Sequence, residues 1–153
     1  MSRRDQIAMG PQEIADFLDQ QRVVIVATNG IQGWPHLMPL WYVVREDQVW
    51  AWTYAKSQKV RNLERDQRAT LQVEDGEQYQ ELRGVMVQAE TVIHRDTELV
   101  AEIGTAIFRR YTADSLGDGF LDAIRAQAAK RVALQFVPNT VASWDHGKLG
   151  GSY

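Results

Sequence analysis

A cluster of cations and hydrogen-bond donors around residue 57 is the part of this sequence best suited to chemistry. Between residues 56 and 68 five Lys or Arg side chains stand against two acidic ones, a local charge of +3 in a chain of net charge -3. Ser57 offers a hydroxyl, Gln58 an amide and Lys59 a full positive charge within one helical turn. If Ser57 begins a helix, the free N–H groups and the dipole of its first turn favour an anion at that place. The spacing therefore predicts a phosphate site, with a capped surface helix bearing solvated cations as the alternative.

Several common chemistries lack their residues in this chain. There is no cysteine, which excludes disulfides and thiolate chemistry. The sequence has no glycine-rich dinucleotide loop, Walker loop or nucleophile elbow, and its three histidines are too far apart for a metal motif. An acidic chain is not expected to bind nucleic acid. Because the longest apolar run, Val23 to Ala27, is too short for a membrane span and residues 1–5 contain no signal segment, we expect a cytoplasmic protein without a membrane anchor.

The elements that position the candidate site are mostly strands. Alternating apolar residues bounded by turn signals predict strands, and apolar residues at four-residue spacing predict helices. Strands are expected at Val23–Thr28, Pro35–Val44, Val49–Tyr54, Ala69–Glu74, Arg83–Ile93, Arg131–Val137 and Val141–Trp144, and helices at Gln12–Gln21, Ser57–Arg65, Thr97–Tyr111 and Phe120–Ala129. Six or seven strands with few helices are typical of a closed or nearly closed barrel. We therefore expect a mainly β fold, a β-barrel with flanking helices, in one domain over residues 1–153.

Two side-chain patterns refine this expectation. Pro39 cannot donate a hydrogen bond to a ladder, so its strand is expected at a sheet edge or at a bulge. Trp50, Trp52 and Tyr54 alternate along one strand and must share one face of the sheet. Aromatic residues at such spacing usually pack in the core, and Trp50 is expected there.

The residues from Ser57 to Leu71, SQKVRNLERDQRATL, resemble the phosphate-binding segment of the pyridoxamine phosphate oxidase-like split barrels. Residues 83–90 resemble the long strand of those proteins, and residues 137–144 resemble their closing strand, which carries a flavin-contacting tryptophan. The likeness covers roughly residues 12–149. It implies a split β-barrel of the FMN-binding-protein type that works as a homodimer, with the cofactor site at the subunit interface.

Two departures from the family pattern bear on the cofactor. The oxidases that use FMN usually show an Arg-Lys pair in this segment, whereas here Gln58 precedes Lys59, so a phosphate monoester loses one guanidinium fork. The tail over residues 143–151 also lacks the arginine and histidine pattern that holds pyridoxine phosphate. In both departures the sequence resembles the reductases that use the deazaflavin coenzyme F420. The phosphodiester of that coenzyme carries one charge, and its glutamyl tail adds carboxylates. The cations that would suit such an extended anion are Lys56, Arg61 and Arg65.

The resemblance also implies where the cofactor lies, with its ring system against the second and third strands. Trp144, at the end of the last strand, is the expected aromatic neighbour. The candidate cofactor-binding residues are Pro39, Leu40, Trp41, Trp52, Thr53, Ser57, Gln58, Lys59, Arg61, Asn62 and Trp144. No catalytic residue or metal ligand is assigned.

The activity that the resemblance implies is hydride transfer from reduced coenzyme F420 to an electron-poor organic substrate. The cofactor supplies the difficult chemistry, and the protein supplies position, electrostatics and exclusion of water. A proton could come from solvent, Tyr54, Tyr79 or His36. Two alternatives stay open: an FMN-dependent oxidoreductase or oxidase, and a protein that binds flavin or haem without turnover. The substrate pocket would be built from the loops Gly76–Gln80 and Thr112–Gly119, whose shape the sequence does not specify.

Overall fold

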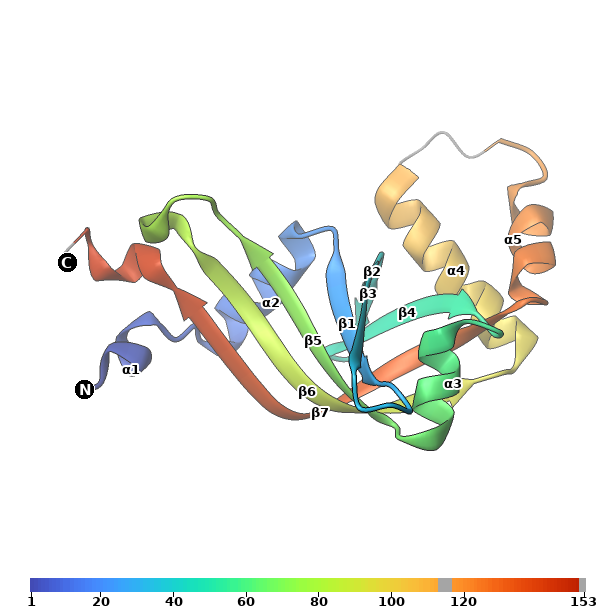
Figure 1. Ribbon diagram of the computed structural model, residues 1–153. Helices are drawn as coiled ribbons and strands as arrows, with labels where there is room; N and C mark the ends of the chain where they lie inside the picture. The colour runs from blue at the N-terminus through green and yellow to red at the C-terminus, as the bar shows by residue number, and fades with distance from the viewer. Residues whose placement is uncertain (113–116, 152–153) are drawn as a thin grey trace.

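The computed structural model describes residues 1–112 and 117–151, which form a curled antiparallel sheet with flanking helices (Figure 1). The strands are β1 (Val24–Asn29), β2 (Pro35–Leu40), β3 (Val43–Arg45), β4 (Gln48–Tyr54), β5 (Arg68–Asp75), β6 (Arg83–His94) and β7 (Arg131–Asp145). The helices are α1 (Arg3–Ile7), α2 (Pro11–Gln20), α3 (Gln58–Arg65), α4 (Thr97–Thr112) and α5 (Phe120–Ala128), with short 3-10 helices η1 (Tyr79–Glu81) and η2 (His146–Leu149). The expected mainly β split barrel is confirmed, and α1, η1 and η2 are additions to the predicted elements.

The chain passes directly from one edge of the sheet to the other. The strand order is β2-β1-β5-β6-β7-β4-β3, so Trp41 and Tyr42 alone join the two edge strands. The expectation of a single strand over Pro35–Val44 is therefore wrong. Because β2 pairs with β1 and β3 pairs with β4, one straight strand could not serve both edges. Pro39 lies on the edge strand β2, where its missing N–H costs no ladder bond, as predicted.

A buried polar network holds the bend between the two edges. Tyr42 is fully buried, and its hydroxyl donates to the carbonyl of Leu18 at 2.5 Å. The guanidinium of Arg110, in the last turn of α4, lies over the Tyr42 ring at 4.5 Å and donates to the carbonyls of Tyr42, Leu18 and Gln21. The Arg110 side chain thereby connects the end of α4 with the C-terminal end of α2 and with the bend at Tyr42.

The last strand is continuous, which corrects a second expectation. The sequence predicts two strands separated by Pro138 and Asn139, but β7 runs unbroken and pairs with β6 along its length. The register shifts by one residue between Gln88, which lies opposite Thr140, and Ala89, which lies opposite Pro138. Asn139 is thus the extra residue of a β-bulge. A bulge absorbs a residue and bends the strand, so turn residues need not end it.

Strand β4 separates two hydrophobic clusters. Val49 and Ala51 belong to the main cluster, which also contains apolar residues of α2. Trp50 and Trp52 belong to a second cluster beneath α4 and α5. The predicted alternation along this strand and the place of Trp50 in the core are confirmed. Helix α4 approaches closely at Gly104, where a Cβ would overlap the Trp52 ring.

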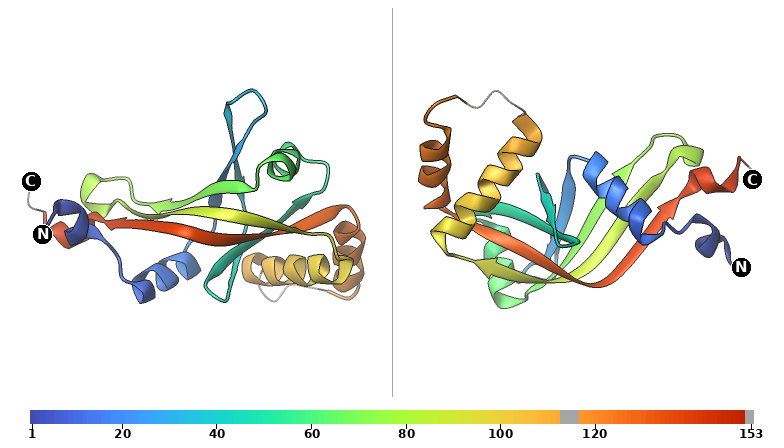
Figure 2. Two further views of the ribbon diagram at one scale, coloured as in Figure 1. Left: turned by 90° about the horizontal axis from the view of Figure 1, so that it is seen from below. Right: turned by 180° about the vertical axis from the view of Figure 1, so that it is seen from behind.

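The helices divide the molecule into two ends. Helices α3, α4 and α5 lie at one end of the curled sheet, and α1, η2 and both chain termini lie at the other (Figure 1, Figure 2). No helix of the described residues has the length and apolar character needed to cross a bilayer. The loop expected over Thr112–Gly119 lies partly outside the described residues, at 113–116.

Candidate functional site

The first turn of α3 presents a buried hydroxyl without a partner. Ser57 is the N-cap of α3 with extended backbone angles, as the sequence predicts. Its side chain makes no capping hydrogen bond, and its Oγ is buried without any hydrogen-bond partner. A buried hydroxyl that is left unpaired costs stability unless a bound group or ordered water satisfies it. Ser57 is therefore available to a ligand at the positive end of the helix.

Lys59 lies in the same turn and is buried, with 7% of its surface exposed. Its Nζ donates to Thr53 Oγ1 at 3.0 Å, which uses one of the three N–H bonds of the ammonium group. Burial, and secondarily the positive charge of Arg131, hold the pKa of Lys59 below its usual value. None of the ion pairs among residues 1–112 and 117–151 gives this ammonium a carboxylate. A buried cation without a counter-ion is the strongest feature of the site, because an anionic ligand would compensate it.

Asn62 and Arg65 fix α3 against the sheet. Asn62 is fully buried, and its Nδ2 donates to Thr28 Oγ1 of β1 at 3.1 Å. Its Oδ1 accepts from Gln58 Nε2 at 2.8 Å and from Arg65 Nη2 at 2.9 Å. Asn62 thus orients the helix, while the exposed Arg61 and Gln58 flank the first turn on the solvent side. Their contact with a cofactor stays a prediction.

The predicted ring-binding residues of β2 and the bend are partly open to solvent. Trp41 is 46% exposed, and it stacks on Tyr111 of α4 with ring centroids 4.5 Å apart. Pro39 is exposed and Leu40 is half-buried beside it. Only part of the Trp41 ring is free to meet a cofactor, because α4 covers the rest.

Trp52 and Thr53 lie near the end of β4, on opposite faces of the sheet. The Trp52 ring is buried and packs against Gly104 and edge-on against Phe108. The guanidinium of Arg131 also lies against it, 4.5 Å from the ring centroid. Thr53 points to Lys59 and holds its ammonium in place. In this arrangement Trp52 supports the site from beneath.

Trp144 lies far from Lys59 within one chain. It pairs with Gly84 at the end of the sheet that carries η2, and a Cβ on Gly84 would overlap its ring. Arg131, which pairs with Tyr54 near α3, is about 13 residues away along β7, roughly 40 Å of strand. One chain therefore does not bring Trp144 to the turn at Ser57.

Sequence reasoning missed Arg131. This residue begins β7 and is separated from Ser57 by more than 70 positions, so no local spacing indicates it. Its Nε is buried without a hydrogen-bond partner. Only the pairing of β4 with β7, which a single sequence does not reveal, places it beside the turn.

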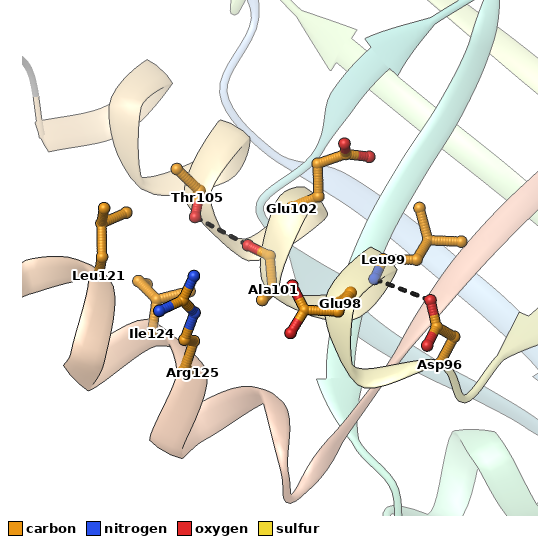
Figure 3. A pocket seen from close by; sticks show the side chains of 9 residues that line it. All are labelled: Asp96, Glu98, Leu99, Ala101, Glu102, Thr105, Leu121, Ile124 and Arg125. Carbon is orange, nitrogen blue, oxygen red and sulfur yellow. Dashed lines mark hydrogen bonds between the residues drawn. The ribbon is translucent and has the colours of Figure 1, made fainter.

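A hollow between α4 and α5 has the wrong charge for a phosphate (Figure 3). Its volume is about 430 Å³, and Asp96, Glu98 and Glu102 line it against the single cation Arg125. Its polar side chains are also partly committed within α4, since Asp96 accepts from the N–H of Leu99. The turn at Ser57 is the better anion site.

Comparison with known proteins places the chain in a family. Residues 11–145 match the family described as pyridoxamine 5'-phosphate oxidase. A conserved hypothetical protein of known structure from Mycobacterium tuberculosis is 37% identical, with a TM-score of 0.91, and the match covers 100% of this chain and 95% of that one. A search of the curated proteins found no match.

Two more distant structures share the fold. One is described as an F420 reductase, with 19% identity, a TM-score of 0.69 and coverage of 87% of this chain and 98% of that one. The other is the heme storage protein HutZ from Vibrio cholerae, with 16% identity, a TM-score of 0.68 and coverage of 90% and 97%. The match over residues 11–145, together with the curled sheet and the cationic turn after β4, shows that this chain belongs to the pyridoxamine 5'-phosphate oxidase family of split barrels.

Proposed function

We propose that this protein binds a phosphorylated flavin-type cofactor at the first turn of α3 and acts as an oxidoreductase. The observation that carries the proposal is the buried Lys59 ammonium, which has no carboxylate among the described residues and lies in the same turn as the unpartnered Ser57 hydroxyl. Free donors and uncompensated charge fit a phosphate group. When bound, such a cofactor supplies hydride transfer, and this chain's part is to hold its phosphate and to exclude water from its ring.

Coenzyme F420 is the cofactor we favour, with transfer of hydride to an electron-poor organic substrate. Gln58 is exposed and donates to Asn62, so position 58 contributes no charge to the phosphate. A phosphodiester with one charge needs less compensation than a phosphate monoester. The similar fold of an F420 reductase supports the choice, although at 19% identity it shows only the fold.

FMN is the second candidate, and storage of a ligand without turnover is the third. The similar fold of a heme storage protein supports the third candidate. The visible spectrum of the purified protein, followed by separate titrations with coenzyme F420, FMN and haem, distinguishes the three. We expect the tightest binding for coenzyme F420. Tight binding of haem alone would contradict both flavin proposals.

The second part of the proposal is a homodimer in which the partner copy completes the site. Trp144 lies near one end of β7, whereas Lys59 lies on α3 beside the other end, so both can contact one cofactor only if they come from different chains. Isologous pairing of two copies creates two such sites by symmetry. Sedimentation at micromolar concentration should therefore show twice the mass of one chain.

Replacing Trp144 tests its part in that site. Trp144→Ala should weaken cofactor binding about tenfold, because it removes an aromatic contact with the ring system. Trp144→Phe should retain most of the affinity. Fluorescence titration measures both, and thermal melting monitors the packing against Gly84. If Trp144→Ala unfolds the protein and Trp144→Phe binds normally at monomer mass, Trp144 is only a packing residue.

A further inference from the structure

Arg131 is positioned by backbone hydrogen bonds beside the turn that leads to Ser57. It is the first residue of β7 and pairs with Tyr54, the last residue of β4. The N–H of Ala55 donates to the carbonyl of Lys130 at 3.0 Å, and the N–H of Ser57 donates to the carbonyl of Tyr54 at 3.0 Å. The start of β7 and the first turn of α3 are thus held together by the same short loop.

Aromatic rings hold the Arg131 guanidinium in place. It lies 4.0 Å from the centroid of the Tyr54 ring and 4.5 Å from that of Trp52. Stacking of this kind stabilises a guanidinium by its face and leaves the N–H groups on its edge to bind other partners. The side chain is therefore preorganised before any ligand arrives.

The Arg131 side chain donates no hydrogen bond to any of the residues that the structure describes. Its Nε is buried without a partner, and within the described ranges no carboxylate forms an ion pair with the side chain. Its charge is also, after burial, the second cause of the lowered pKa of Lys59. A cation with a buried donor unmet gains stability from an anion that binds the free edge of its guanidinium.

We propose that Arg131 is a phosphate-binding residue and supplies, from β7, the guanidinium that Gln58 does not supply from α3. This inference rests on the proposed cofactor site. Its planar fork can donate two parallel hydrogen bonds to two oxygens of one phosphate, while Lys59 donates from the helix. With both cations, the site can compensate either the single charge of a phosphodiester or the greater charge of a monoester.

The test separates the phosphate from the ring system by pairing each cofactor with its phosphate-free counterpart. FMN is compared with riboflavin, and coenzyme F420 with its deazaflavin nucleoside, by fluorescence titration at low salt. The variants are Arg131→Gln and the matched control Lys130→Gln, which removes one positive charge from the adjacent, exposed residue. Thermal melting of the ligand-free variants monitors folding.

Arg131→Gln should weaken binding of the phosphorylated ligands about 10- to 100-fold and leave their phosphate-free counterparts within a factor of two. Lys130→Gln should leave both affinities near those of the wild type. Equal losses for phosphorylated and phosphate-free ligands, or none, would show that Arg131 only packs against Trp52 and Tyr54, and the inference would fail while the proposed function stands.

Two further outcomes are decisive. If Arg131→Gln does not fold, Arg131→Lys is measured instead, because it keeps the positive charge and loses the planar fork. Arg131→Lys should weaken binding of the phosphorylated ligands by a smaller factor and leave the phosphate-free ligands unchanged. If the ratio of the two affinities stays that of the wild type, the inference is overturned. If the wild type binds neither coenzyme F420 nor FMN, the proposed function fails and the role of Arg131 fails with it.

Discussion

Replacing Lys59 with methionine should leave the ligand-free protein at least as stable as the wild type while weakening binding of a phosphorylated cofactor about 10- to 100-fold. The side chain is 7% exposed, and among the described residues its ammonium has no counter-ion. Methionine keeps the volume of the buried stem and removes a charge that is costly to bury. Chemical denaturation and cofactor titration measure the two effects.

The stability difference between Lys59→Met and the wild type should depend on pH. Burial, with a smaller contribution from Arg131, lowers the pKa of Lys59 in the folded state. Between the folded and unfolded pKa values the unfolded chain binds more protons, so the free energy of unfolding of the wild type rises with pH there. The advantage of the methionine variant is therefore fully present below the folded pKa and shrinks as pH rises through it.

Lys56→Met is the matched control, because Lys56 is exposed and precedes the helix. It should leave stability nearly unchanged and weaken cofactor binding less than Lys59→Met does. A true ion contact at Lys59 should also flatten the salt dependence of binding in Lys59→Met. Equal cofactor affinities for Lys59→Met and the wild type would remove the phosphate site from α3.

Replacing Arg110 with alanine should destabilise the fold by about 3–5 kcal/mol, the largest effect on stability that we expect. Its Nη2 donates to the carbonyls of Leu18, Asp19 and Gln21 at 2.9, 2.9 and 2.6 Å, and its Nη1 donates to the carbonyl of Tyr42 at 2.7 Å. The last carbonyls of a helix have no partner within it, so Arg110 supplies what α2 lacks. Its loss removes these four hydrogen bonds at once and leaves, among the described residues, only the hydroxyls of Tyr42 and Tyr111 to serve the carbonyls of Leu18, Gln21 and Tyr42.

Arg109→Ala is the control for Arg110→Ala, since it removes the same group from the neighbouring, exposed position of α4. It should change stability by less than about 0.5 kcal/mol in urea denaturation. A similarly small loss for Arg110→Ala would mean that water replaces the guanidinium at the end of α2, and that the bend at Tyr42 holds without it.

The local features of the site follow from neighbouring residues, and the sequence predicted them. Alternation placed Trp50 and Trp52 on one face of β4, and the helix predicted over Ser57–Arg65 buries Val60 and Leu63. The turn at Ser57 begins a helix because strand signals end before it and apolar spacing of the helical kind begins. Each of these depends on interactions over a few residues, which a single sequence contains.

Expectations failed where distant segments override local signals. Pro138 and Asn139 are turn residues, yet pairing with β6 keeps the chain extended through a bulge. The strand expected over Pro35–Val44 breaks because its two halves pair on opposite edges of the sheet. Local propensity is weaker than a ladder of hydrogen bonds and the burial that accompanies it.

The sequence alone determined the type of fold, the family resemblance and the cationic turn that begins α3, because alternation, turn residues and a short run of donors are local properties. Only the tertiary structure decided which of those cations lack a counter-ion. It buried Lys59 beside Thr53, committed Arg65 to Asn62, and brought Arg131 to the turn from the far end of the chain. The reason is physical: burial and unmet hydrogen bonds depend on which strands pair, and that is settled by the packing of the whole sheet.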